Sequence, residues 1–235
     1  MSLKTVPALK VTSGDAPAQI SFLRGLTPEE IHLILAAGKF RRFSARCRMT
    51  RQGEPADHLL LLWKGRGRYF FDTQNGKKLN LRPIMPGFIF GGAALVSGNT
   101  AYLLGSETLK DSVALVWEGA TIRALAKRFN VLLENALLLA LDHFTWYTSA
   151  YASLSSQTAR ERLAHVLVML TQEMGQKVLG GLELDLTNEE LAASANITPY
   201  TASRIVSEWK KMGALHKQRG KILVRAPDRL LLGMG

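Results

Sequence analysis

The chain of 235 residues is poor in cysteine, and Cys47 is the only one. A single thiol cannot form a disulfide within one chain, and it cannot supply the four thiolates of an iron–sulfur cluster. Long hydrophobic runs are also missing, because the longest, residues 131–141, is interrupted by Glu134 and Asn135 and is about half a membrane span in length. The first residues lack the charged-then-apolar pattern of a secretory signal. These absences favour a cytoplasmic protein without a membrane partner.

Acidic residues are scarce relative to basic ones, 19 Asp and Glu against 30 Lys and Arg, so the formal net charge is +11. Excess positive charge attracts polyanions such as nucleic acids, because binding releases their condensed counterions. Membrane surfaces and acidic proteins attract it equally, so charge alone does not select the partner. The hydrophobic fraction of 47% and the length are ordinary for a globular protein of one large or two modest domains.

Histidine is scarce as well, and His58 is the only one of five within residues 40–115, the region that is predicted below to form strands. A catalytic metal site in such a domain needs two or three histidines and a carboxylate that converge. We therefore expect no metal site and no catalytic residues, and an enzyme is the disfavoured alternative.

Patterning divides the sequence into four parts. Residues 1–18 mix Pro, Ser, Gly and Lys without a period and predict a flexible arm. Residues 19–118 predict a helix followed by a β-domain, and residues 119–155 predict a short helix and then a long one. Residues 156–235 are mostly helical again and predict a second domain.

The strand-rich region consists of short apolar runs separated by glycine, proline and asparagine. These runs include 58–63, 67–71, 102–105 and 112–117. Asn75-Gly76 is the strongest hairpin signal, because both residues tolerate the positive φ of a type I′ turn. Many short strands at this spacing predict an antiparallel barrel or sandwich.

The long helical segment, from about residue 131 to 155, carries apolar residues at alternating steps of four and three. Two helices that pack side by side require this heptad spacing, so the pattern predicts a dimer seam. A helix that lies on its own sheet would show a broader face of 3.6-residue period, and this alternative stays open. The predicted seam residues are Leu133, Leu137, Ala140, Phe144, Tyr147, Tyr151 and Leu154.

The stretch 186–224 carries the most informative motif. Thr187 and Glu190 have the spacing of a capping box that begins one short helix, and Thr198, followed by proline, begins another. Asn196 lies between them, where a sharp turn requires a left-handed backbone. Two short helices joined this tightly predict a helix-turn-helix.

The second of these helices has the properties of a recognition helix, which presents the side chains near its N-terminal end to base edges in the major groove. Arg204 is the best candidate for a bidentate contact with guanine, and contact with phosphate is its alternative. Residues 215–224 predict a hairpin wing with a basic tip. Between residues 204 and 229, eight basic residues face two acidic ones, which is typical of a track for DNA phosphates. The predicted contacts with duplex DNA are Thr198, Tyr200, Thr201, Ser203, Arg204, Lys217, Arg219 and Lys221.

Taken together, these features resemble the Crp/Fnr family of bacterial transcription regulators over nearly the whole chain. Arg51-Gln52-Gly53-Glu54-Pro55-Ala56-Asp57-His58-Leu59 followed by Lys64-Gly65 is similar to the family's early strand-turn signature. Residues 158–163 resemble its lead-in to the DNA-binding domain, and residues 187–206 resemble its helix-turn-helix.

This resemblance implies an α+β fold with an N-terminal antiparallel β-barrel of jelly-roll type, a long dimerisation helix and a C-terminal winged helix-turn-helix. It also implies a homodimer that binds a pseudo-palindromic operator in duplex DNA, with two recognition helices about one helical turn apart. A barrel ligand coupled to DNA affinity, and RNA polymerase as a further partner, are expected on the same ground.

The sequence departs from the cyclic-nucleotide-binding members of this family. Those members carry a Gly-Glu pair and then an arginine in the phosphate cassette, whereas here Gly92 takes the place of the glutamate and Asn99 that of the arginine. Losing both removes the ribose hydrogen bond and the counter-charge of a buried phosphate, so we expect no tight binding of cAMP or cGMP. The residues of this degenerate pocket are Gly91, Gly92, Ala93, Asn99 and Thr100. In the recognition helix, Pro199-Tyr200 replaces the family's frequent Arg-Glu pair, so the operator should differ from the common one.

The sequence does not specify the effector, the target genes or whether the protein activates or represses. Haem is one alternative, with a methionine, His32, His58, His143, His165 or Cys47 as ligand. A redox switch is another, because Cys47 lies between Arg46 and Arg48, whose charges favour the thiolate, although a half-buried strand cysteine is the simpler interpretation. A barrel that senses nothing and serves only as a scaffold is the third.

Overall fold

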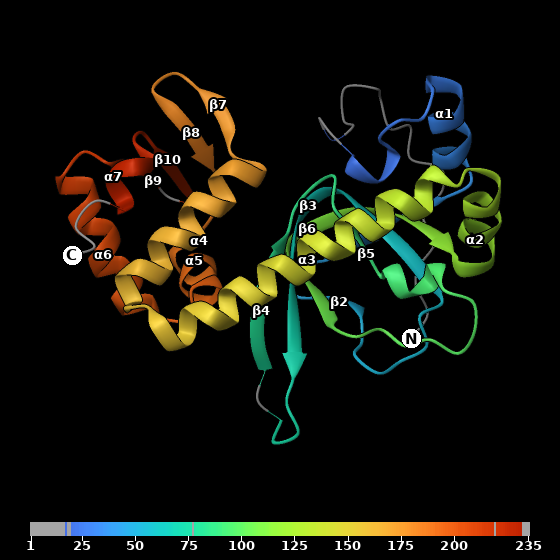
Figure 1. The fold of residues 1–235 in the computed structure, drawn as a ribbon, viewed down its shortest axis with the longest axis horizontal. Coiled ribbons are helices and arrows are strands. Elements are labelled where there is room, and N and C mark those ends of the chain that lie inside the picture. Colours follow the sequence, from blue (N-terminus) through green and yellow to red (C-terminus); the bar gives the residue numbers. More distant parts are fainter. Residues whose placement is uncertain (1–16, 18–19, 77, 219, 232–235) are drawn as a thin grey trace. The chain divides into compact units, whose positions relative to one another are not determined.

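A computed structural model describes residues 17, 20–76, 78–218 and 220–231. Contacts divide the chain into two compact units, Met1–His143 and Phe144–Gly235. The long helix α3 (Val131–Ser156) begins in the first unit and ends in the second (Figure 1). The predicted arm, 1–18, lies almost entirely outside the described residues. The predicted α+β class, with an antiparallel sheet domain before a helix-turn-helix domain, is confirmed.

The first unit is built on one antiparallel sheet with two long central strands, β3 (His58–Asp72) and β6 (Gly105–Glu118). The shorter strands are β1 (Lys39–Phe43), β2 (Arg48–Thr50), β4 (Lys78–Ile84) and β5 (Ile89–Phe90). β1 and β2 pair with β6, whereas β4 and β5 pair with β3. Among the described strands, β1 and β4 remain at the edges, so the pairing does not close the sheet into a ring.

The two long strands replace the shorter separate strands that the sequence predicted. Runs 58–63 and 67–71 form one strand, because register shifts between Leu62 and Gly67 bend it while it stays paired with β6. Gly65 has a φ of +106°, and a Cβ at this residue would lie 2.2 Å from Oγ of Ser112. Only glycine fits so close an approach, so the residue that looked like a strand break is a bend within a strand.

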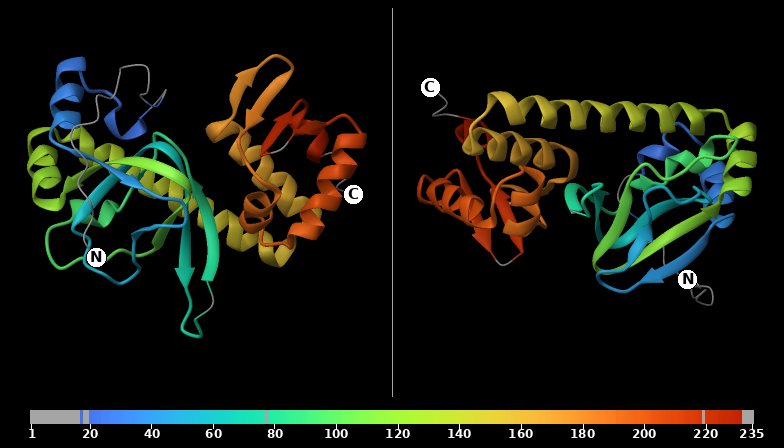
Figure 2. Two further views of the ribbon diagram at one scale, coloured as in Figure 1. Left: turned by 180° about the vertical axis from the view of Figure 1, so that it is seen from behind. Right: turned by 90° about the horizontal axis from the view of Figure 1, so that it is seen from below.

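β3 is buried on both faces of the sheet, which explains why its first half is continuously apolar. Leu59 and Leu61 share a core with buried residues of helices α1 (Pro28–Ala36), α2 (Gly119–Arg128) and the start of α3. Leu60 and Leu62 lie in a second core with residues of β4 and β5. Figure 2 shows α1, α2 and the start of α3 grouped at one end of the sheet. The Trp117 indole donates a 2.7 Å hydrogen bond to the carbonyl of Ile34 and fastens α1 to β6.

The second unit combines helices with a small sheet of strand order β7-β8-β10-β9. Its further helices are α4 (Ala159–Met174), α5 (Asn188–Ser194), α6 (Pro199–Lys211) and α7 (Pro227–Leu231). Its strands are β7 (Gln176–Val178), β8 (Gly181–Leu184), β9 (Leu215–Gln218) and β10 (Lys221–Val224). The segment 175–181, which contains three glycines, thus contributes to a hairpin. Trp209 is fully buried at the centre of this unit's core.

Candidate functional site

The tight turn of the helix-turn-helix lies between α5 and α6. Asn196 has a φ of +49°, which is the left-handed backbone predicted at this residue. Thr187 and Glu190 form the predicted capping box of α5. Thr198 caps α6 by accepting a 3.1 Å hydrogen bond from the backbone N–H of Thr201. Side chains within each helix start therefore fix where the two helices begin.

Helix α6 has a buried face and an exposed face. The buried residues are Ala202, Ile205, Val206 and Trp209. On the opposite face Tyr200 is 79% exposed, and Ser203 and Arg204 are exposed beside it. Thr201 is half-buried, and its hydroxyl lies 2.9 Å from the hydroxyl of Thr198. The two threonines therefore form the helix start, whereas the other three predicted residues form an exposed surface.

Ser207 extends this exposed surface and was not among the residues predicted from the sequence. It lies four residues after Ser203 and donates a 2.8 Å hydrogen bond to the Ser203 carbonyl. The helical spacing of four was the signal that could have identified it.

An acidic residue holds the predicted base-reading arginine. Glu208 accepts a 3.1 Å hydrogen bond from Arg204, and it also accepts one from Arg160 at the start of α4. The bond from Arg160 is the main cause that lowers the pKa of Glu208. The Arg160 guanidinium lies 5.6 Å from the ring centroid of Trp209, which is buried in the core. This cation–π contact holds Arg160 in place, and Glu208 links Arg160 to Arg204.

The predicted wing is the hairpin of β9 and β10. Lys221 donates a 2.6 Å hydrogen bond to Glu183 of β8, and this bond raises the pKa of Lys221. Partial burial, and secondly the charge of Lys210, lower the pKa of Lys217. Arg219, at the predicted tip, lies outside the described residues. Lys221 therefore stabilises the small sheet in addition to any contact with phosphate.

The residues of the predicted cassette lie around a short 3-10 helix, η3 (Gly92–Leu95). Gly91 caps it with a φ of +79°, where a Cβ would lie 2.6 Å from the His58 carbonyl. The Thr100 hydroxyl donates a 2.9 Å hydrogen bond to the carbonyl of Ala93. Asn99 is exposed, whereas Gly92 lines the pocket described next. These residues thus lie close together in the chain, but Asn99 faces solvent, Gly92 lines the pocket and Thr100 bonds to the backbone of η3.

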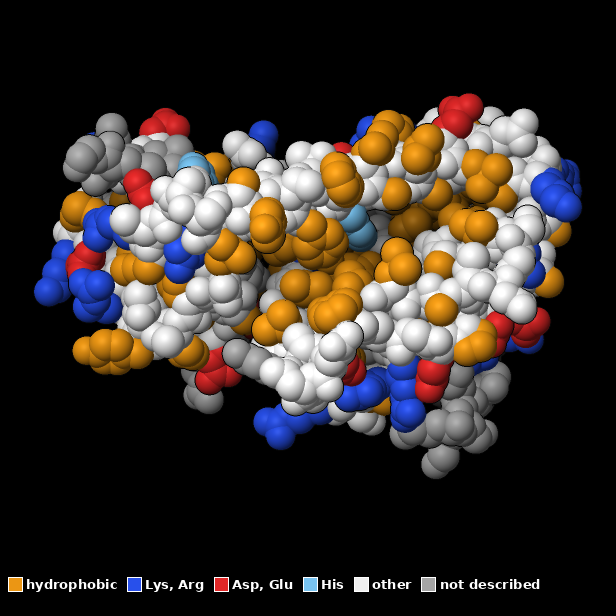
Figure 3. Space-filling view, turned by 60° about the horizontal axis from the view of Figure 1, so that its bottom comes forward, with side chains coloured by type: hydrophobic (Ala, Val, Ile, Leu, Met, Phe, Trp, Pro, Cys, Tyr) orange, Lys and Arg blue, Asp and Glu red, His pale blue; other side chains and the backbone are white. Residues whose placement is uncertain are grey.

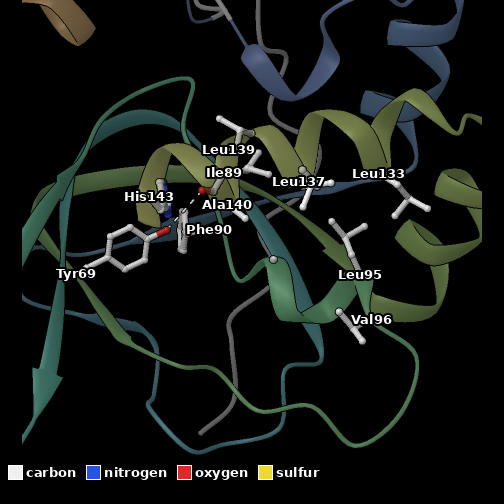
Figure 4. A pocket seen from close by; sticks show the side chains of 12 residues that line it. Tyr69, Ile89, Phe90, Leu95, Val96, Leu133, Leu137, Leu139, Ala140 and His143 are labelled. Carbon is white, nitrogen blue, oxygen red and sulfur yellow. Dashed lines mark hydrogen bonds between the residues drawn. The ribbon is translucent and has the colours of Figure 1, made fainter. Parts of the chain in front are cut away.

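An apolar pocket of about 320 Å³ lies in the first unit among the sheet, η3 and the first half of α3. Tyr69 and Phe90 line it from the sheet, Leu95 from η3, and Leu137 and His143 from α3. Figure 4 shows Tyr69 and His143 at one end of the pocket and Leu95 at the other. The rings of Tyr69 and His143 meet edge-on, with centroids 5.9 Å apart.

The polar end of this pocket is electrically neutral. Burial, and secondly the positive charge of Arg82, lower the pKa of His143 to about 4, so the imidazole is uncharged near neutral pH. The Tyr69 hydroxyl donates a 3.5 Å hydrogen bond to the carbonyl of Ile89. From the sequence, His143 was predicted only as a possible haem ligand, and Tyr69 was not predicted at all. A lone histidine in an apolar helix was the one available signal.

The exposed face of α3 carries most of the predicted seam. Leu133, Leu137, Ala140, Phe144, Tyr151 and Leu154 are exposed, with Phe144 at 67% and Tyr151 at 78%. Tyr147 differs, because it is half-buried and stacks edge-on against Trp146 at 5.1 Å. Leu138 and Leu141 are also exposed and widen the apolar surface beyond the heptad positions. Figure 3 shows hydrophobic side chains gathered at the surface on one face of the molecule.

The other candidate haem and redox ligands are dispersed. His32 and His165 are exposed on α1 and α4. The backbone of His58 is held by the Tyr102 hydroxyl, which accepts from its N–H and donates to its carbonyl, each at 3.0 Å. Cys47 lies in the turn between β1 and β2, not in a strand as the simpler interpretation expected, and is half-buried against the second core. Within the described part of the chain, no three His, Cys, Asp or Glu residues are grouped so as to hold a metal ion.

Comparison with known proteins gives the same two-part organisation. A cyclic nucleotide-binding domain model matches residues 40–129, and a Crp-like helix-turn-helix domain model matches residues 161–232. The chain belongs to the Crp/Fnr family of transcription regulators. The prediction of a regulator rather than an enzyme is thereby confirmed.

Individual members of the Crp/Fnr family are distant from this chain in sequence. The cyclic AMP receptor protein of Thermus thermophilus is 26% identical over 201 residues, which cover 86% of this chain and 90% of that protein. The structure of FixK2 from Bradyrhizobium japonicum superposes with a TM-score of 0.71 at 19% identity, covering 83% of this chain and 96% of that one. A CooA mutant from Carboxydothermus hydrogenoformans superposes with a TM-score of 0.70 at 22% identity, covering 91% and 98%. At these identities the solved structures show that the fold is shared.

No helix among the described residues of this family member combines the length and apolar character needed to cross a membrane. Even α3, the longest helix, is interrupted by polar and acidic side chains such as Glu134, Asn135 and Asp142.

Proposed function

We propose that this Crp/Fnr regulator binds a pseudo-palindromic operator as a homodimer and that its effector is not a cyclic nucleotide. The observation that carries the proposal is the division of α6 into a buried face and an exposed N-terminal surface of Tyr200, Ser203 and Arg204. A helix capped and packed in this way presents its first turns to the edges of bases.

Each DNA-contacting residue has a separate expected role. Arg204 reads a guanine once its guanidinium leaves Glu208, and Ser203 and Tyr200 contact neighbouring bases or the backbone. Thr198 and Thr201 orient the helix start toward a phosphate. Lys217, Arg219 and Lys221 of the wing contact phosphates and contribute affinity without base preference.

The homodimer is supported by the exposed apolar side chains of α3. Residues such as Leu137 and Phe144 recur at heptad spacing, and an apolar stripe on a helix is normally covered by a partner. Two copies joined along this helix place two recognition helices about a two-fold axis, and this arrangement matches a palindromic site.

Selection of random duplex fragments on the purified chain, at near-physiological salt and with nothing added, tests this proposal. Recovery of a two-fold symmetric site supports a dimeric regulator that is already competent to bind. Weak binding without sequence preference and with a steep salt dependence contradicts operator recognition by the chain as purified. Titration with cAMP by calorimetry is the second test, and micromolar affinity would overturn the claim about the effector.

The proposal includes the predicted cytoplasmic location and RNA polymerase as a further partner. The scaffold alternative is separated by a different measurement. A small molecule that shifts both the melting temperature and the DNA affinity identifies a sensor, since only differential binding to two states moves their equilibrium.

A further inference from the structure

The pocket of Tyr69 and His143 has the chemistry of a ligand site that accepts no charge. Among the described residues that line it there is no Lys, Arg, Asp or Glu. Burying an ionised group without a counter-charge or full hydrogen bonding is strongly unfavourable. Arg82 influences His143 electrostatically but is not one of the lining residues.

The size and shape of the pocket limit the ligand further. Its volume of about 320 Å³ is near the lower end of the range for small-molecule sites, which is about 300–1,000 Å³. The walls are mainly aliphatic, with Leu95, Val96 and Leu133 at the end far from the two polar rings (Figure 4). A compact hydrocarbon body therefore fits along the pocket, with a single polar group at the His143 end.

We propose that this pocket binds a compact, uncharged, largely apolar molecule that carries one hydrogen-bonding group, such as a phenol, an alcohol or a ketone. The polar group contacts the imidazole of His143, which offers one donor and one acceptor in its neutral form. The apolar body packs against Phe90, Leu95 and Leu139. That this molecule acts as the effector rests on the proposed function, whereas its binding does not.

Gly92 is a lining position at which a larger side chain would meet no packed neighbour. It lines the pocket, and a Cβ at this residue would have no neighbouring heavy atom within 4 Å. Gly92→Phe therefore adds bulk at the pocket, and Gly92→Ala is the matched control that changes the backbone freedom but adds little volume.

The test uses the full chain and matched pairs of probes: 2-naphthol with 2-naphthoate, and further neutral phenols, alcohols and ketones of that size with their carboxylate or ammonium analogues. Thermal unfolding and calorimetry measure binding. We expect the neutral member to bind at least about tenfold more tightly than its charged analogue. Gly92→Phe should abolish this binding, and Gly92→Ala should retain it. His143→Leu should weaken 2-naphthol about fivefold while leaving naphthalene unchanged.

Several results overturn the proposal. Equal or tighter binding of the charged analogues shows that the pocket is not selective for neutral molecules. Absence of binding by every neutral probe shows that the pocket is not a ligand site, for example because a second copy covers it. Binding of 2-naphthol that is unchanged by both Gly92→Phe and His143→Leu places the ligand elsewhere.

Failure of this inference is distinguishable from failure of the proposed function. If no neutral probe binds but the chain still selects a symmetric DNA site, the pocket proposal fails. The proposed operator binding is then still supported, and the sheet domain serves as a scaffold. If a neutral probe binds in the pocket but no symmetric site is selected, the ligand site stands and the operator proposal fails.

Discussion

Acid should destabilise the first unit through His143. Burial, with the charge of Arg82 as a second cause, lowers the pKa of this imidazole from 6.5 to about 4, and Asp142 opposes the shift only in part. In the unfolded chain the pKa returns to about 6.5. Between these values the unfolded state holds a proton that the folded state does not, so the free energy of unfolding falls as the pH falls.

The size of the effect can be worked out from the two pKa values. Each pKa unit corresponds to about 1.4 kcal/mol, so the difference amounts to about 3 kcal/mol in total. The loss begins near pH 6.5 and is complete near pH 4. Domains are typically stable by only about 5–15 kcal/mol, so this loss is measurable.

Urea unfolding across this pH range, with His143→Gln beside the natural chain, isolates the contribution because glutamine does not titrate. The free energy of unfolding of the variant should fall by about 3 kcal/mol less than that of the natural chain. Burial also lowers the pKa of His58, but that effect is common to both chains and cancels in the difference. His32→Gln, which alters an exposed histidine, is the matched control. Equal losses in both chains, or an NMR titration that places the pKa of His143 near 6.5, would refute the reasoning.

Three further predictions concern the second unit and α3. Arg204→Ala should weaken binding to the selected operator by about 10- to 100-fold and reduce the base preference at one position of each half-site. Competition with variant duplexes measures both effects, and an unchanged base preference contradicts contact between Arg204 and a base. Thr198→Ala should lower the free energy of unfolding by about 1 kcal/mol because the N-cap bond is lost, and chemical denaturation that detects no change excludes the capping role. Leu137→Glu with Phe144→Glu should give monomers in analytical ultracentrifugation and abolish operator binding, whereas a persisting dimer places the interface elsewhere.

Local chemistry made the helix-turn-helix predictable. A cap such as Thr198 acts on an N–H only three residues away, and the left-handed turn at Asn196 depends on one residue type. The buried face of α6 follows from a period of 3.6 residues, which is also a short-range property. These features need no knowledge of the rest of the fold, so sequence patterns were sufficient.

The pocket could not be predicted in the same way, because its parts come from remote segments. Tyr69 lies on β3 and His143 on α3, two elements far apart in the sequence, and their rings meet only in the folded chain. The long strands were themselves predicted as separate pieces, since Gly65 looks the same in a turn and in a bulge. A register shift of one residue would turn Tyr69 to the other face, so no local pattern could establish this contact.

Net charge is a weaker argument for DNA binding than it first appeared. Residues 1–143 carry 19 Lys and Arg against 11 Asp and Glu, whereas residues 144–235, which include the helix-turn-helix, carry 11 against 8. Most of the excess positive charge thus belongs to the sheet-containing unit, and within the second unit Lys221 and Arg204 are engaged by Glu183 and Glu208. What distinguishes the proposed DNA-binding surface is therefore the exposed, capped N-terminal half of α6. Formal charge predicts attraction to a polyanion, but the placement of a few uncovered side chains decides which bases can be read.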